Sequence, residues 1–389
     1  MTEAGPAGEH EQGGSGGTNG RGTRTRVTLT EISSRAWEHP ADRGALTALR
    51  QLRGFDYLLR KLAGLWNERA LRLVYIGSSV RVDHRQFARL HLLYTEAATS
   101  LDVRRLPDLY VIADPVPQAV TLGIDQPFVV LTSGMVDLLD DDDELRFVLG
   151  HELGHVLSGH AVYTTMLIQL LRVSLTLSWL PFGTLGMRAI IAALYEWRRK
   201  AELSSDRAGL LASQDPPGAL RVHMKLAGGG KIDDLDIAAF RAQGEEYLAS
   251  PDVRDSVLRL LLLEARSHPF AVVRAAELQR WVDDGSYTRI LRGNYPRRSE
   301  DANATVQEDT KEATRHYRQA FERSQDPLVS LVRDVGGGLA NVRDWATGWL
   351  RGGPRDRDAD GGGNGDGDGE AGGGEPRDAD PDRDPDPRA

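Results

Sequence analysis

The sequence contains no cysteine. This absence excludes disulfide bonds, thiolate metal sites and cysteine nucleophiles, and it leaves histidine and carboxylate side chains as the ligands available to a zinc ion. Basic residues are also in deficit, because 48 Lys and Arg stand against 57 Asp and Glu, which gives a net charge of −9. An acidic chain of this kind argues against nucleic acid as the main partner, so we expect no nucleic-acid partner.

Long apolar runs are scarce as well. Residues 1–26 are Gly-rich, with no apolar stretch that would indicate a signal peptide, so we expect a disordered N-terminal segment and a cytoplasmic protein. Ala161–Leu180 has about the length to span a bilayer, but Arg172 interrupts it, and the run Met187–Tyr195 is too short. We predict a helical hairpin that packs in the protein or lies peripherally on a membrane, in preference to a transmembrane pair.

One motif organises the chain: His151-Glu152-Leu153-Gly154-His155, which reads H-E-x-x-H. In a helix, residues four apart lie on the same face, so both imidazoles point to one spot where a tetrahedral cation can bind both. Glu152 can then face a water molecule on that metal without being a ligand itself. The motif also occurs by chance in many helices, so it needs a third ligand to carry a function.

The best third ligand is Glu202, which lies four residues before Asp206 in a predicted helix. The two carboxylates face the same way, so Glu202 can bind the metal while Asp206 accepts a hydrogen bond from the outer nitrogen of a ligand histidine. An isolated pair of this spacing is ordinarily a solvated acidic pair, but the motif upstream favours a site for one Zn²⁺ per chain. We assign His160 and His223 structural roles, and we favour a surface role over metal ligation for each.

The periodicity predicts an α+β fold that is mainly helical. Apolar residues recur at steps of three and four from Pro40 onward and across Asp83–Ser100. Three short apolar runs between turns predict strands at Leu109–Ala113, Ala119–Leu122 and Phe128–Leu131. We expect a small antiparallel sheet beside the motif helix, where an edge strand can pair with an extended peptide.

Together these motifs resemble the M48 family of zinc metallopeptidases, which includes the heat-shock HtpX type and the CAAX-processing type. The resemblance rests on H-E-L-G-H followed by S-G-H, a long apolar insertion, E-L-S-S-D-R-A and S-H-P-F-A-V-V-R, and it covers about Leu106–Trp281. It implies a gluzincin fold, with Glu202 as the third zinc ligand and Asp206 as the partner of a ligand histidine.

The resemblance also implies roles for residues away from the motif helix. His268, in the His-Pro segment, carries over as a residue near the metal that helps to stabilise the oxyanion, and Arg274 as the arginine that follows it. A helix-breaking His-Pro turn is the alternative for His268. The family has Asn-Ala on the edge strand that holds the substrate backbone, and Gln118-Ala119 stands at that place here. The hydrophobic N-terminal spans of the HtpX type are missing, which indicates a soluble or membrane-surface relative.

We therefore predict a zinc metalloendopeptidase that hydrolyses protein or peptide substrates in protein quality control, with Glu152 as the general base. The alternative is a non-catalytic scaffold or chaperone-like binder of the same fold at the membrane surface, which has no need of Glu152. The chain is predicted to comprise four parts: a disordered segment at 1–26, the metallopeptidase domain at 27–297, a helical extension at 298–351 and a disordered tail at 352–389.

Overall fold

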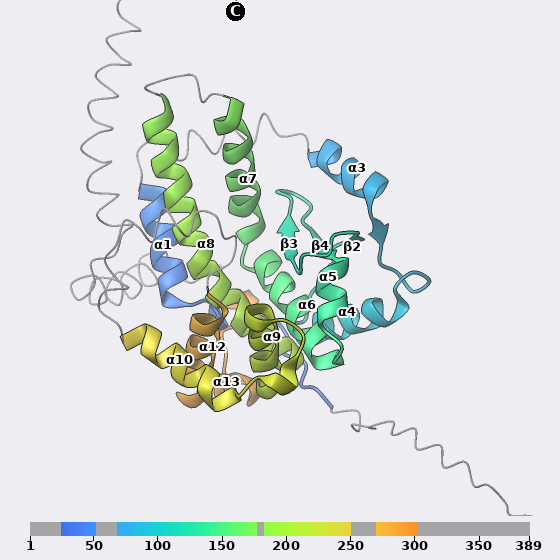
Figure 1. Ribbon diagram of the computed structural model, residues 1–389, viewed down its shortest axis with the longest axis vertical. Coiled ribbons are helices and arrows are strands. Elements are labelled where there is room, and N and C mark those ends of the chain that lie inside the picture. Colours follow the sequence, from blue (N-terminus) through green and yellow to red (C-terminus); the bar gives the residue numbers. More distant parts are fainter. Residues whose placement is uncertain (1–24, 52–67, 177–182, 250–269, 302–389) are drawn as a thin grey trace, which may run out of the picture. The chain divides into compact units, whose positions relative to one another are not determined.

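Helices dominate the described part of the chain, as the periodicity predicts. The computed structural model describes residues 25–51, 68–176, 183–249 and 270–301, which belong to one compact unit (Figure 1). The α-helices are α1 Pro40–Gln51, α3 Glu68–Ser78, α4 Ala88–Ser100, α5 Ser133–Leu138, α6 Asp142–Leu157, α7 His160–Thr176, α8 Gly183–Ser213, α9 Pro216–Gly228, α10 Ile237–Ala249, α12 Ala271–Asp283 and α13 Ser286–Leu291. Short 3₁₀ turns are η1 Ser34–Ala36, η2 Ile232–Asp234 and η3 Arg298–Glu300.

The sheet has four short strands, and it is mixed where an antiparallel sheet was predicted. The strands are β1 Val80–Arg81, β2 Leu109–Ile112, β3 Ala119–Leu122 and β4 Phe128–Thr132, in the order β1-β2-β4-β3. β3 pairs with β4 antiparallel, whereas β2 and β4 run parallel. The antiparallel prediction is wrong for the pair β2 and β4. β3 lies at the outer edge of the sheet, and β4 lies between β2 and β3 and runs in the same direction as β2. The three predicted strands are otherwise confirmed, and β1 was not predicted.

The motif helix α6 is the buried centre of the domain. The Asp141 side chain caps its N-terminus by accepting a hydrogen bond from the Asp143 backbone N–H, and the first turn is acidic, as the helix dipole favours. Every residue from Glu144 to His155 is buried. A helix buried on all sides must satisfy its polar side chains inside the protein, and Glu144 does so with Arg221 and Lys225 of α9.

The hairpin that follows α6 has one long arm. The apolar run at 187–195 was predicted as a short arm, but it continues into the helix that carries Glu202, and the two form the single helix α8. Buried residues of α7 and α8, among them Leu167 and Trp197, pack together with Ala45 and Leu49 of α1. No helix within the described ranges is long and apolar enough to cross a membrane.

Several predictions fall on residues that the structure does not describe. Residues 1–24, the tail 352–389 and nearly all of the extension 298–351 lie outside the described ranges. The predicted oxyanion residue His268 also lies outside them.

Candidate metal centre

Three side chains place ligand atoms at the spacing of a tetrahedral zinc site. The two Nε2 atoms of His151 and His155 are 3.1 Å apart. Glu202 places Oε2 at 3.4 Å from His151 Nε2 and Oε1 at 3.6 Å from His155 Nε2. Zinc bonds of about 2.0–2.1 Å in tetrahedral geometry separate ligand atoms by about 3.3 Å. The structure therefore brings together the three predicted ligands in an arrangement that could hold a metal ion.

Small residues bring the two ligand-bearing helices together. A Cβ on Gly154 of α6 would lie 2.6 Å from the Ala208 Cβ of α8, and a Cβ on Gly150 would lie 2.3 Å from the Ala212 Cβ. Only glycine at these positions lets the helices approach this closely. The approach sets Glu202, which is 1% exposed, opposite both histidines.

We expect Gly154→Ala to destabilise the protein by about 1–3 kcal/mol, because its Cβ must push α8 away. Zinc affinity should fall in parallel, because Glu202 moves with α8. Gly77→Ala is the matched control, since a Cβ on this helical glycine of α3 meets nothing within 4 Å. Urea denaturation of both variants measures the effect, and equal stability would show that α6 and α8 do not need this glycine.

The outer nitrogen of His151 is held by a carboxylate. His151 Nδ1 lies 3.0 Å from Asp206 Oδ1. Arg274 of α12 donates two hydrogen bonds to Asp206, one of them from Nε to Oδ2 at 2.7 Å. The same guanidinium also pairs with Glu202, since its Nη1 lies 3.2 Å from Glu202 Oε2. Asp206 and Arg274 therefore lie beside the candidate metal ligands. Such a bond to the outer nitrogen fixes the ring orientation and raises the basicity of the ligand.

The pKa values of these groups show how strongly they interact without a metal ion. Burial lowers the pKa of His151, but hydrogen bonds to Asp206 and Glu202 outweigh it and raise the pKa to about 9. Burial and the charge of His151 hold the pKa of His155 well below its usual range. Burial opposes ionisation of Asp206, yet the Arg274 charge holds the pKa of that carboxyl well below its usual value. A metal ion held here would need the neutral form of His151, so its binding would compete with that proton.

Glu152 points to the sheet rather than joining the ligands. The Thr121 hydroxyl of β3 lies 2.6 Å from Glu152 Oε2 and 3.1 Å from its carbonyl oxygen. Burial raises the pKa of the Glu152 carboxyl, against the charge of His151 and the Thr121 hydrogen bond. A raised pKa suits a group that both takes and returns a proton near neutral pH. No motif in the sequence singles out Thr121, although it lies two residues after Ala119 and so on the same face of the strand.

The backbone groups of the two predicted substrate-binding residues, Gln118 and Ala119, point in opposite directions at the edge strand β3. The Gln118 backbone pairs inward, since its N–H donates to Thr132 Oγ1 at 2.8 Å and its carbonyl accepts from the Thr132 N–H at 3.0 Å. Backbone groups alternate between the two edges of a strand, so those of Ala119 point away from β4. The backbone at Ala119 can therefore pair with an added strand, whereas Gln118 offers an exposed side chain.

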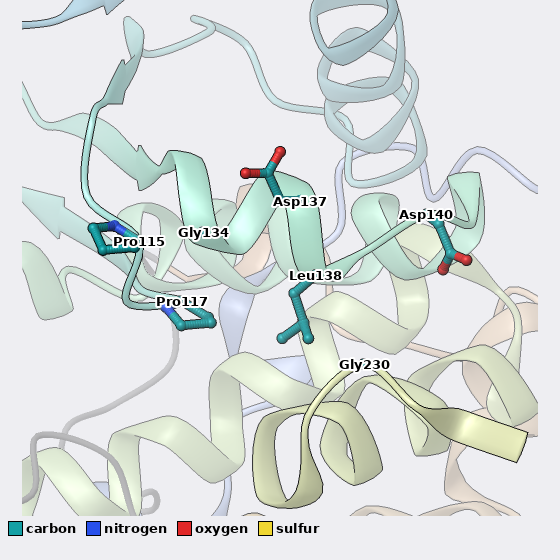
Figure 2. A pocket seen from close by; sticks show the side chains of 7 residues that line it. All are labelled: Pro115, Pro117, Gly134, Asp137, Leu138, Asp140 and Gly230. Atoms are coloured by element: carbon teal, nitrogen blue, oxygen red, sulfur yellow. The ribbon is translucent and has the colours of Figure 1, made fainter. Parts of the chain in front are cut away.

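A surface pocket of about 410 Å³ lies at the loop that leads into β3 (Figure 2). Pro115 and Pro117 line it on one side and Gly230 on another, with the Leu138 side chain of α5 between them. None of the metal-centre residues described above is among those that line it. This hollow is therefore separate from the candidate metal centre.

Two histidines for which a surface role was favoured are buried, so the surface part of that prediction is wrong. His223 of α9 is 0% exposed, with Nδ1 at 2.8 Å from the Ala219 carbonyl oxygen and Nε2 at 3.4 Å from Asp206 Oδ2. His160 is 3% exposed, and its Nδ1 lies 3.0 Å from Nδ1 of His155. No spacing in the sequence relates His223 to Asp206, because α8 and α9 meet only in the folded chain.

Comparison with known proteins places the chain in a family. The model for peptidase family M48 matches residues 84–282, just over half of the chain. The chain is 36% identical over 271 residues to the plastoglobule-localized metallopeptidase 48, chloroplastic, of Arabidopsis thaliana, which covers 68% of this chain and 78% of that protein. It is 43% identical over 53 residues to a protease HtpX homolog of Tropheryma whipplei (strain Twist), 13% of this chain and 18% of that protein. No solved structure matches the chain. With the geometry above, these matches show that the chain belongs to the M48 family of metallopeptidases.

Proposed function

We propose that this metallopeptidase is a zinc-dependent endopeptidase whose metal is held by His151, His155 and Glu202. The observation that carries the proposal is the set of three ligand-atom separations between 3.1 and 3.6 Å, which matches a tetrahedral zinc ion with one open position. A donor set of two imidazoles and one carboxylate is typical of catalytic zinc sites. Structural zinc sites use four protein ligands, whereas the group found among the described residues contains three.

A zinc ion at this site would polarise the scissile carbonyl and lower the pKa of the attacking water. Glu152 takes the proton of that water and passes it to the leaving amine. Thr121 donates to Oε2 of Glu152 and so orients the carboxylate that receives the proton. Arg274 does not touch substrate in this proposal, since it holds Asp206 and Glu202 in place. His268 would donate to the developing oxyanion, as the family resemblance implies.

The substrate in this proposal is an extended segment of a protein. It would lie along the outer edge of β3 and pair with the backbone at Ala119, with the exposed Gln118 side chain beside it. Thr121, on the same strand, connects this edge to Glu152. A substrate paired there would place its scissile bond near both the general base and the metal ligands.

We also propose a cytoplasmic protein that works in protein quality control and touches a membrane peripherally. The resemblance to the heat-shock HtpX type supports the first part. Exposed apolar side chains on α3, Leu73, Val74 and Ile76, support the second, because such a row favours a lipid or protein surface. One relative is named for its place at plastoglobules, which also favours contact with lipid.

Metal analysis of the purified full chain tests the proposal. We expect about one zinc ion per chain, and we expect His151→Ala, His155→Ala and Glu202→Ala each to lose most of it, because a catalytic site has only three protein ligands. His84→Ala is the matched control, since His84 is exposed and away from this group. Full retention of zinc by Glu202→Ala would place the third ligand elsewhere. A wild-type chain that binds no zinc would overturn the proposal.

A further inference from the structure

The outer nitrogen of His155 faces a second histidine where His151 has a carboxylate. His155 Nδ1 lies 3.0 Å from His160 Nδ1, and His160 Nε2 lies 3.0 Å from Asp42 Oδ2. All three residues are buried. The three groups therefore form a buried chain that begins at a candidate metal ligand and ends at a carboxylate of α1.

The direction of hydrogen bonding along this chain follows from the chemistry of imidazole. If His155 binds a metal through Nε2, its proton sits on Nδ1, so Nδ1–H donates to His160 Nδ1. His160 then accepts at Nδ1 and carries its own proton on Nε2, from which it donates to Asp42 Oδ2. Each nitrogen has one role, and the two distances of 3.0 Å fit both bonds.

The surroundings fix the two outer members of this chain in place. Ser204 of α8 donates from Oγ to Asp42 Oδ2 at 2.6 Å, which ties α1 to the helix that carries Glu202. The Trp197 ring meets the His160 ring edge-on, with centroids 5.5 Å apart. His160 is thus held between an aromatic wall and a carboxylate, and a buried polar chain with every member satisfied holds one geometry.

We propose that His160 and Asp42 are positioning residues that orient His155 for metal binding, as Asp206 orients His151. This inference rests on the proposed zinc site. Asp42 lies on α1, before the stretch 84–282 that matches the family model. A residue outside the matched region therefore holds the histidine that orients His155 in this protein.

The test measures zinc affinity of the full-length protein by competition with a chromophoric chelator. His160→Leu removes the acceptor for His155, and we expect its zinc affinity to fall about 10–100-fold, the range seen when partners of metal ligands are lost. His160→Asn places an amide oxygen near the position of Nδ1, so it should recover part of that loss. Asp42→Asn keeps the shape and removes the charge, so we expect a smaller loss than in His160→Leu.

Two further measurements separate orientation from general destabilisation. Leu49→Ala is the matched control, because this buried residue also anchors α1 but its apolar side chain cannot hydrogen-bond to His155, His160 or Asp42. It should lower the melting temperature and leave zinc affinity within about twofold, because its apolar side chain makes no hydrogen bond to the ligand histidines or to their partners. The visible spectrum of the cobalt-substituted protein should change in His160→Leu, because a rotated His155 alters the ligand geometry, and stay unchanged in Leu49→Ala.

The outcomes distinguish this inference from the function on which it rests. Wild-type protein that binds no zinc overturns the proposed function. Wild-type protein that binds zinc, with His160→Leu and Asp42→Asn within twofold of it, overturns only the positioning roles. Equal losses in Leu49→Ala and His160→Leu also overturn them. If His160→Leu does not fold, the isosteric Asp42→Asn decides the question alone.

Discussion

Replacing Glu152 with glutamine is expected to slow hydrolysis of an unfolded protein such as casein by about 10²–10⁴-fold, the usual contribution of a general base. The amide keeps the size of the side chain and still accepts from Thr121, but it cannot take a proton from water. Zinc content should not change, because Glu152 lies outside the three-ligand group. The measurement is turnover per zinc-loaded molecule.

Glu144→Gln serves as the matched control for this experiment. It is the same substitution on the same buried helix, at a residue that pairs with Arg221 and Lys225 and not with the metal ligands. We expect this variant to lose stability and to keep its turnover per folded molecule. Wild-type turnover by Glu152→Gln would remove Glu152 from the mechanism.

Arg274→Met should destabilise the metal-free protein by about 3–5 kcal/mol, the cost of removing one partner from a buried ion pair. The guanidinium is 5% exposed and neutralises two carboxylates, Asp206 and Glu202, which are each 1% exposed. Methionine fills similar space but leaves both carboxylates without that charge. Added zinc should restore part of the loss, because the metal brings positive charge to Glu202 and stabilises the state that binds it.

Urea denaturation with and without zinc measures this effect. The control is Arg280→Met on the same helix, where the arginine is 49% exposed and pairs with Glu245 and Glu277 at the surface. Its change should stay within about 0.5 kcal/mol, as for most surface substitutions. Similar losses in the two variants would show that Arg274 is not the charge that the buried carboxylates need.

Local pattern was sufficient for the features that depend on neighbouring residues. The spacing of four between His151 and His155 places both rings on one face of any helix, and the acidic residues before them favour a helix start at that point. Alternating and apolar runs predicted β2, β3 and β4 to within one residue at each end. These are periodic or nearest-neighbour effects, so they can be inferred without knowledge of the partner segments.

Pairing between distant segments could not be inferred in this way. The parallel alignment of β2 with β4 depends on which edge receives β3, and no residue in the turns specifies that choice. The expectation of a surface role for His223 and His160 failed for a related reason. A lone histidine carries no periodic signal, and its burial is decided by the helices that pack over it.

The sequence by itself therefore determined the type of chemistry: a histidine pair, a glutamate beside it and a downstream carboxylate pair at helical spacing. Tertiary structure alone decided how that chemistry is supported. Thr121 reaches Glu152 across 31 positions, Arg274 reaches Asp206 across 68, and Ser204 reaches Asp42 across 162. Hydrogen bonds of this kind act over about 3 Å, so they form only after hydrophobic packing of α1, α6, α8 and α12 has brought these side chains together.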